Sequence, residues 1–188
     1  MTKYVLHGGA TSLPSVHNKN FFREMVKELP QPVKILTVYF ANAKEKWSEL
    51  FEDDKKKFSS FNPETKMEFA IAGDDIETLV NQISSNDVIY IRGGRNLLVY
   101  ELFSKIKNLS QLFQGKVVGG SSAGAYVFSR YYYSNDKDRI MEGLGILPIK
   151  TFAHYSEDKT DKLQKLKEYG EDLEVYTIPE AEFVVIEK

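Results

Sequence analysis

The sequence predicts a three-layer α/β/α protein, in which a parallel sheet carries helices on both faces. Strand-like and helix-like segments alternate along the chain, and glycine-rich turns close several of the strand-like runs. Parallel strands need crossover connections, and the intervening helices supply them. With 188 residues and 42% hydrophobic content, the chain is expected to form a single domain, residues 1–188, with a substantial core.

The individual elements follow from apolar runs of strand length and from apolar residues that recur at helical spacing. The expected strands are 4–6, 33–40, 66–71, 88–91, 116–118, 149–153 and 175–178. The expected helices are 18–29, 43–58, 76–83, 97–107 and 123–132, and one that starts near residue 158. Prolines 30 and 32 end the first helix, and Asp74 or Asp75 is expected to cap the third.

Composition and charge narrow the range of functions. A net charge of -2 and a pI near 6.0 argue against a nucleic-acid partner, which favours a small-molecule or peptide substrate. With no cysteine there is no disulfide, thiolate metal site or cysteine nucleophile. We recognise no signal peptide and no apolar run of about 20 residues, so a cytoplasmic protein without a membrane partner is expected. The charged run 53–57 is interpreted as the solvated face of a helix.

The stretch Gly120-Ser121-Ser122-Ala123-Gly124 fits the G-x-S-x-G nucleophile elbow. In that motif a serine lies on a sharp turn between a strand and a helix, where neighbouring backbone leaves no room for a Cβ at the glycines. The alternative interpretation is an ordinary turn built from small residues. Active sites of parallel α/β sheets lie beyond the carboxyl ends of the strands, and this stretch is at that edge.

An acyl-transfer site also needs N–H groups directed at the oxyanion of the tetrahedral intermediate. The residue after the nucleophile, Ala123, supplies one in elbow enzymes, and a glycine-rich loop on another strand supplies the second. Here that loop is Gly93-Gly94, with Gly94 as the candidate, although the pair is equally well explained as a tight turn. Neither Gly93-Gly94 nor Gly8-Gly9 fits a nucleotide-binding fingerprint.

A serine nucleophile needs a base, and the chain has 3 histidines. His154 follows the strand-like run 149–153 and comes after the elbow in sequence, as in elbow hydrolases. His7 and His17 are weaker candidates, and each of the three could instead be a hydrogen-bonded structural group.

Five motifs occur in order along the chain. They are Arg92-Gly93-Gly94, the elbow from Gly120 to Ala125, Gly143-Leu144-Gly145-Ile146-Leu147-Pro148, His154-Tyr155 and Ile178-Pro179-Glu180. Together they resemble peptidase family S51, the group of dipeptidase E and cyanophycinase. The resemblance implies a mostly parallel, flavodoxin-like central sheet related to class I glutamine amidotransferases. It also implies a serine nucleophile and no metal or organic cofactor.

Carried over from the family, Ser122 would be the nucleophile and His154 the general base, with the oxyanion amides on Gly94 and Ala123. The family offers two acids for the third position, which match Asp136 and Glu180. We prefer Glu180, because it follows the strand 175–178 and so reaches the same edge of the sheet. The nearby acids Asp138 and Glu157 are interpreted as solvated loop charges.

Two departures from the family concern the substrate. Arg95 stands directly after the glycine loop, where the family commonly has asparagine or aspartate, and Lys159 stands where dipeptidase E has an arginine. Both are candidate substrate-binding residues, but a lysine cannot hold a carboxylate with the bidentate geometry of arginine. The final strands are expected to be shorter than in dipeptidase E, or absent.

The expected function is that of a serine hydrolase that cleaves small peptides, with dipeptides of acidic N-terminal residue as one substrate class. A non-catalytic binding or stress-related relative is an alternative, and so is an esterase or deacylase that uses the same site. Tyr131-Tyr132-Tyr133 is expected to pack in the core or in an interface, through which two chains could form a homodimer.

Overall fold

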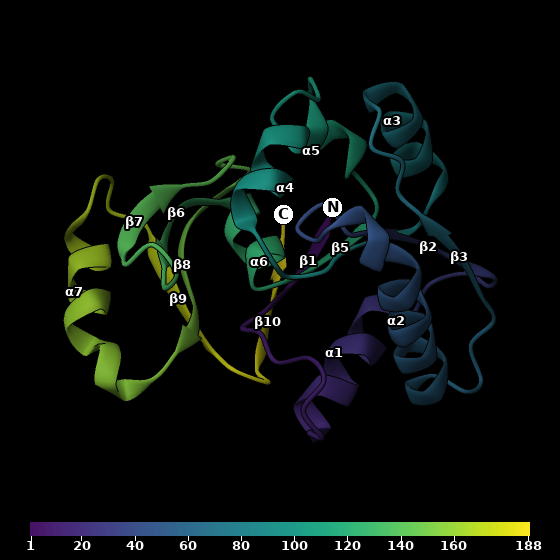
Figure 1. Cartoon of the computed structure of the whole chain (residues 1–188), viewed down its shortest axis with the longest axis horizontal. Coiled ribbons are helices and arrows are strands. Elements are labelled where there is room, and N and C mark those ends of the chain that lie inside the picture. Colours follow the sequence, from purple (N-terminus) through teal and green to yellow (C-terminus); the bar gives the residue numbers. More distant parts are fainter.

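Two β-sheets form the framework of the computed structural model, which covers residues 1–188 (Figure 1). The larger sheet has the strand order β10-β1-β5-β4-β2-β3, and the smaller has the order β7-β6-β8-β9. The strands of the larger sheet are β1 Lys3–His7, β2 Val33–Val38, β3 Met67–Ile71, β4 Val88–Ile91, β5 Val117–Ser121 and β10 Phe183–Glu187. Those of the smaller sheet are β6 Ser129–Ser134, β7 Arg139–Glu142, β8 Leu147–Tyr155 and β9 Glu174–Pro179.

Helices cover both faces of the larger sheet. They are α1 Val16–Val26, α2 Trp47–Phe61, α3 Ile76–Ser85, α4 Asn96–Phe103, α5 Leu109–Leu112 and α6 Ala123–Phe128, while α7 Thr160–Glu168 packs on the smaller sheet. Alternate side chains of β1 show the layering. Val5 packs with Phe22 of α1 and Phe58 of α2 in one core cluster, whereas Tyr4 and Leu6 belong to the cluster that includes α3 to α6.

The predicted fold class is confirmed. Strands β1 to β5 pair with one another in parallel, and only β10 joins the larger sheet antiparallel, next to β1. The carboxyl ends of the central strands lie in register, since His7 pairs with Ser121 and Ile91 with Gly120. The glycine turns predicted at this edge therefore follow neighbouring strands.

The predicted helix 123–132 is wrong in its second half. α6 ends at Phe128, and the chain continues directly into β6, where Tyr131 packs with Phe152 and Leu166. Aromatic residues pack well on a pleated surface, and here the smaller sheet supplies that surface. Tyr131, Tyr132 and Tyr133 are all buried inside the chain, so an interface between two chains would have to form elsewhere.

The last strand is present. β10 pairs with β1 over its whole length, from Lys3 opposite Glu187 to His7 opposite Phe183.

Of the two residues predicted to cap the third helix, Asp74 or Asp75, the cap of α3 is Asp75, because its side chain accepts a hydrogen bond from the Thr78 N–H. No helix of the chain combines the length and the apolar character needed to cross a membrane.

Candidate active site

Ser122 lies on the sharp turn between β5 and α6. Its backbone has φ +52° and ψ −102°, a conformation that residues with a Cβ rarely adopt. The glycines on either side allow the strand and the helix to approach closely. A Cβ on Gly124 would lie 2.7 Å from the Ile91 carbonyl oxygen, and one on Gly120 would overlap the backbone of Gly124. The glycines of the motif are thus required by packing, which both interpretations of this stretch predict.

His154 faces this serine from the smaller sheet. It lies at an irregularity of β8, where the register with β9 shifts between Ala153 and Tyr155, and its φ is +54°. Such a bulge redirects a side chain relative to its neighbours in the strand. The result is a distance of 2.9 Å between His154 Nε2 and Ser122 Oγ.

Glu180, which directly follows β9, completes a row of three polar side chains. Its Oε1 lies 3.0 Å from His154 Nδ1. When Nδ1–H donates to this carboxylate, Nε2 carries the lone pair and can accept the Ser122 hydroxyl proton. This is the geometry that a nucleophile, a base and an orienting acid require.

Asp136, the other acid considered, lies on the opposite flank of the pair. It lines a narrow cavity of about 30 Å³ together with Ser122, His154 and Asn135, but no hydrogen bond joins its carboxylate to the imidazole. The arrangement therefore brings Glu180, and not Asp136, against His154. The catalytic role of either acid stays a prediction.

Three consecutive carbonyl groups at the end of β1 hold the segments that carry this row. The oxygen of His7 accepts the N–H of Ser122 at 2.9 Å, that of Gly8 accepts the N–H of His154 at 2.9 Å, and that of Gly9 accepts the N–H of Ala181 at 3.0 Å. We call these groups the 7–9 carbonyl row. Sequence reasoning missed this arrangement, for which the pair Gly8-Gly9 was the one available signal.

The other two histidines have structural partners. His7 is fully buried and accepts the Gly9 N–H at Nδ1, so its Nε2–H donates to Asn18 Oδ1 at 2.7 Å. Burial lowers the pKa of His7 to about 4, and the side chain is therefore neutral at physiological pH. His17 is exposed and lies 3.2 Å from Glu182.

Replacing Gly9 by alanine is expected to lower activity about 100-fold, because a displacement of about 1 Å at a catalytic group has an effect of that size. Gly9 has φ +121°, and its added Cβ would overlap the His154 ring, lying 2.6 Å from Nε2. Gly115→Ala is the matched control, since Gly115 also has a positive φ, +75°, but nothing lies within 4 Å of an added Cβ. Steady-state kinetics on both variants checks this, and equal activities would contradict it.

The candidate oxyanion amides belong to Gly94 and Ala123. Ala123 is the first residue of α6, so its N–H has no helical carbonyl to bind. The N–H of Arg95 donates to the Ala41 oxygen, whereas that of Gly94 has no partner in the backbone. Gly94 has φ +151°, and a Cβ there would lie 2.5 Å from the Ala41 oxygen, so the turn needs glycine.

A cleft of about 490 Å³ opens beside the serine and the histidine. It is lined by Gly9, Ala10, Thr11, Ser12, Leu13, Arg92, Gly93, Gly94, Ser121, Ser122, His154 and Glu180. The two predicted substrate-binding residues do not line it. Arg95 borders a separate cavity with Ala43 and Lys46, and Lys159 donates from Nζ to the main-chain oxygen of His154.

Arg92 lines this cleft and forms ion pairs with two acids of α2. Its Nη1 lies 2.8 Å from Asp53 Oδ2 and 2.8 Å from Asp54 Oδ1, and Lys57 Nζ pairs with Asp53 Oδ2 and with Ser12 Oγ. The interpretation of 53–57 as a solvated face is therefore wrong for Asp54, whose side chain is 0% exposed. The partner that buries it comes from a distant strand end, which helical periodicity cannot reveal.

This network predicts a pH dependence of stability. Burial raises the pKa of Asp54 from its ordinary value of 3.8 to about 6, although the neighbouring Arg92 opposes the shift. Because the folded state then binds the proton more tightly than the unfolded state, the contribution of Asp54 to the free energy of unfolding falls as pH rises from about 4 to about 6. The free energy of unfolding of Asp54→Asn minus that of wild type should therefore increase by about 2 kcal/mol from pH 4 to pH 7. Urea denaturation at both pH values measures this, and a pH-independent difference would contradict it.

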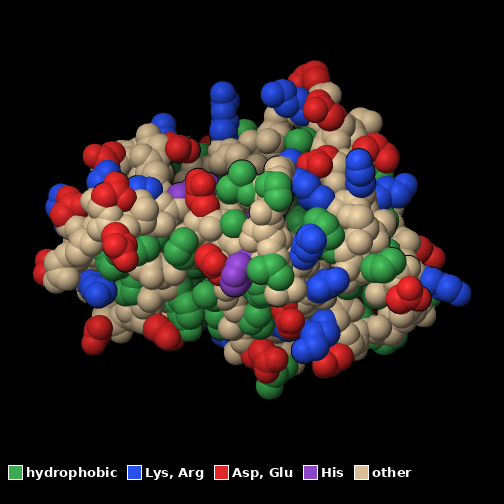
Figure 2. All heavy atoms as spheres, turned by 90° about the horizontal axis from the view of Figure 1, so that it is seen from below, with side chains coloured by type: hydrophobic (Ala, Val, Ile, Leu, Met, Phe, Trp, Pro, Cys, Tyr) green, Lys and Arg blue, Asp and Glu red, His purple; other side chains and the backbone are tan.

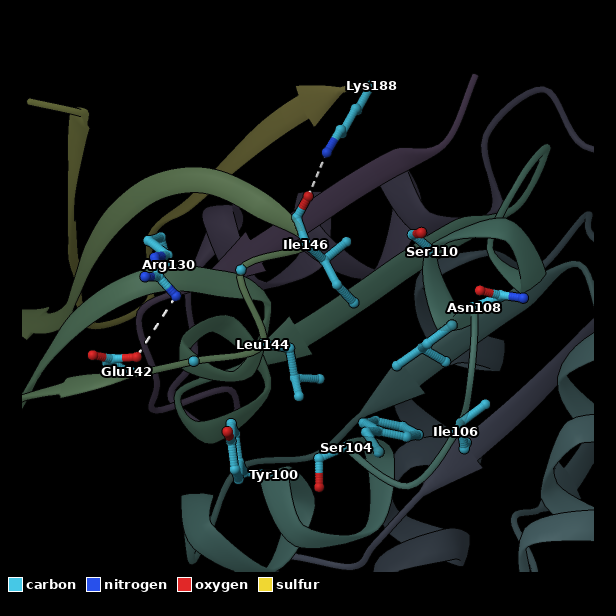
Figure 3. A pocket seen from close by; sticks show the side chains of 14 residues that line it. Tyr100, Ser104, Ile106, Asn108, Ser110, Arg130, Glu142, Leu144, Ile146 and Lys188 are labelled. Carbon is cyan, nitrogen blue, oxygen red and sulfur yellow. Dashed lines mark hydrogen bonds and ion pairs between the residues drawn. The ribbon is translucent and has the colours of Figure 1, made fainter. Parts of the chain in front are cut away.

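A second cavity, of about 510 Å³, lies away from this site (Figure 3). Figure 3 shows Tyr100 and Ser104 on one side, with Arg130 paired to Glu142 on another and Lys188 Nζ donating to the Ile146 oxygen. Neither Ser122 nor any of its partners lines it. Nowhere in the chain do three or more histidine, aspartate or glutamate side chains form a group that could hold a metal ion.

A row of serine, histidine and glutamate at the carboxyl edge of a mostly parallel sheet is an arrangement that many hydrolases share. The model of peptidase family S51 matches residues 5–188. The chain therefore belongs to peptidase family S51.

Two solved structures share this fold at low sequence identity. One is a putative peptidase E protein from Listeria monocytogenes EGD-e, which is 20% identical, with a TM-score of 0.68 over 99% of this chain and 94% of that one. The other is a peptidase from an acI-B1 Actinobacterium, which is 17% identical, with a TM-score of 0.66 over 99% of this chain and 83% of that one. No curated protein matches the chain.

Proposed function

We propose that this S51 protein is a serine peptidase that cleaves small peptides through an acyl-enzyme on Ser122. One observation carries the proposal: Glu180, His154 and Ser122 form a continuous row, with distances of 3.0 Å and 2.9 Å between successive polar atoms. Membership of a family of peptidases supports the same reaction class.

In the proposed reaction, Ser122 Oγ attacks the carbonyl carbon of the peptide bond while His154 Nε2 takes the hydroxyl proton. The negative charge that develops on the carbonyl oxygen is stabilised by the N–H groups of Gly94 and Ala123. Breaking the C–N bond then releases the amine, which receives the proton from His154. Glu180 keeps the imidazole oriented and stabilises its cation. Water next attacks the ester, with His154 again as base, and frees the acid and Ser122.

We infer short peptides as the substrates. The cleft is formed by turns of the chain and holds about 490 Å³, a size suited to a small ligand. Dipeptides with an acidic N-terminal residue stay the first class to test, with Lys159 and Arg95 as the candidate binding residues. Arg95 lies in the separate cavity on the other side of Gly94, so only a substrate that extends beyond the cleft would reach it. Lys159 would have to exchange its bond to the His154 main-chain oxygen for one to the substrate.

Labelling with a fluorophosphonate probe tests the nucleophile. Wild-type protein is expected to be modified at Ser122, and Ser122→Ala is not. A panel of Asp-X, Glu-X and Gly-X dipeptides, together with simple esters of the same acids, then separates peptidase from esterase activity. Absence of labelling, combined with identical behaviour of wild type and Ser122→Ala on the panel, would contradict the proposal and favour a non-catalytic binding protein.

A further inference from the structure

The spaces on the two sides of the Ser122–His154 pair differ in their charged residues. On the side of the narrow cavity lies the exposed carboxylate of Asp136. The cleft is lined by the cation Arg92 and by the carboxylate of Glu180, and its Ser12 is bonded to Lys57. Figure 2, which views the molecule from the α1 end, shows Lys and Arg side chains interspersed with Asp and Glu over this face. A substrate with a negative group is therefore favoured to place it toward Arg92, and away from both Asp136 and Glu180.

Only one nitrogen of the Arg92 guanidinium is used within the chain. Nη1 makes the bonds to Asp53, Asp54 and the Leu50 oxygen. Nε and Nη2 make no hydrogen bond within the chain, and neither is among the fully buried polar atoms that lack a partner. A guanidinium presents parallel N–H groups that match the two oxygens of a carboxylate.

The rest of the network holds this guanidinium in place. Asp54 is fully buried against the guanidinium, and Asp53 binds both Arg92 and Lys57. The Arg92 side chain is therefore held from two sides, and it is only 17% exposed. Two cations and two acids lie within the network, which leaves it without a net negative charge that would repel an anion. A pre-positioned donor loses less conformational entropy when it binds a ligand.

We propose that the free edge of Arg92 binds a carboxylate of the substrate and is a specificity-determining residue of the cleft. The inference rests on the proposed function, because it concerns the substrate of the same site. The carboxylate is either the C-terminus of the peptide or an acidic side chain, since both present the same pair of oxygens.

Binding measured without turnover tests this role. Isothermal titration calorimetry on Ser122→Ala protein would compare Ala-Leu, Ala-Leu-amide and Asp-Leu-amide. A peptide whose carboxylate pairs with Arg92 is expected to bind about tenfold or more tightly than Ala-Leu-amide. Preference for Ala-Leu identifies the C-terminus as the bound group, and preference for Asp-Leu-amide identifies the side chain.

Variants of Arg92 in the same background link the preference to this residue. Arg92→Met combined with Asp54→Asn removes the guanidinium without leaving a buried unpaired carboxylate, and should bring the affinity ratio close to one. Arg92→Lys keeps the charge but loses the paired donors, so it should reduce the affinity ratio severalfold. If the double variant does not fold, the ratio in Arg92→Lys alone tests the role of Arg92. Lys56→Met, which removes an exposed charge of α2 outside the cleft, should leave the ratio unchanged.

Three results would overturn the role of Arg92: equal affinity for all three peptides, no binding of any of them at millimolar concentration, or an undiminished preference in both Arg92 variants. The outcome is separate from that of the proposed function. Wild-type protein that prefers carboxylate peptides but hydrolyses none of them would contradict the peptidase activity and leave the role of Arg92 standing.

Discussion

Ser122→Ala is expected to lower kcat about 10⁴-fold to 10⁶-fold, because it removes the atom that forms the acyl-enzyme. The same loss is expected for His154→Ala, since Nε2 is the group within 2.9 Å that can take the hydroxyl proton. The losses of activity at residues that act as one unit do not add up, so the double variant should have about the kcat of the less active single variant. Steady-state kinetics on the best peptide of the panel measures all three.

His17→Ala is the control for this series. His17 is exposed and pairs with Glu182 outside the row, so its replacement should leave kcat nearly unchanged. A double variant whose loss equals the product of the two single losses would mean that Ser122 and His154 act independently. That result would remove the basis of the proposed reaction.

Glu180→Gln is expected to lower kcat by about 10² to 10⁴, because an amide in place of the orienting carboxylate can hold the wrong imidazole tautomer and cannot stabilise its cation. Asp136→Asn is the matched comparison, since it makes the same chemical change on the other flank of His154. It should retain activity within about tenfold of wild type, because no hydrogen bond joins Asp136 to the imidazole.

The two variants also distinguish kinds of effect. If Asp136 contacts substrate in the narrow cavity, Asp136→Asn should raise KM and leave kcat largely intact, whereas Glu180→Gln should act on kcat. A larger loss of kcat in Asp136→Asn than in Glu180→Gln would reverse the assignment of the acid.

Local signals account for the parts of the fold and site that could be predicted. The strands 33–40 and 88–91 and the glycine turns at their ends follow from short runs of sequence, and so does Ser122 on its turn. His154 follows from its place after the strand-like run 149–153 and after the elbow in sequence. The resemblance to the family supplied the two candidate acids, and the position of Glu180 after the strand 175–178 is the reason for preferring it. In the structure His154 lies within hydrogen-bonding distance of both Ser122 and Glu180, although no pattern in the sequence indicates that His154 and Glu180 belong to a second sheet.

The parts that could not be predicted depend on contacts between distant segments. Tyr131–Tyr133 continue a helical pattern, but they form a strand because this segment pairs with the neighbouring strand β8. Asp54 has the spacing of an exposed helix position, yet Arg92, 38 residues away, buries it. The bulge at His154 has no local sequence signal, because it depends on how β8 aligns with β9.

The 7–9 carbonyl row makes the integrity of the site an all-or-none property. The three N–H groups that it accepts belong to Ser122, His154 and Ala181, on segments that follow β5, lie in β8 and follow β9. A fluctuation that moves this one stretch of backbone releases all three segments together. Mild heating or denaturant should therefore switch individual molecules from fully competent to fully incompetent, so that the remaining rate reports the fraction of intact molecules and KM stays constant.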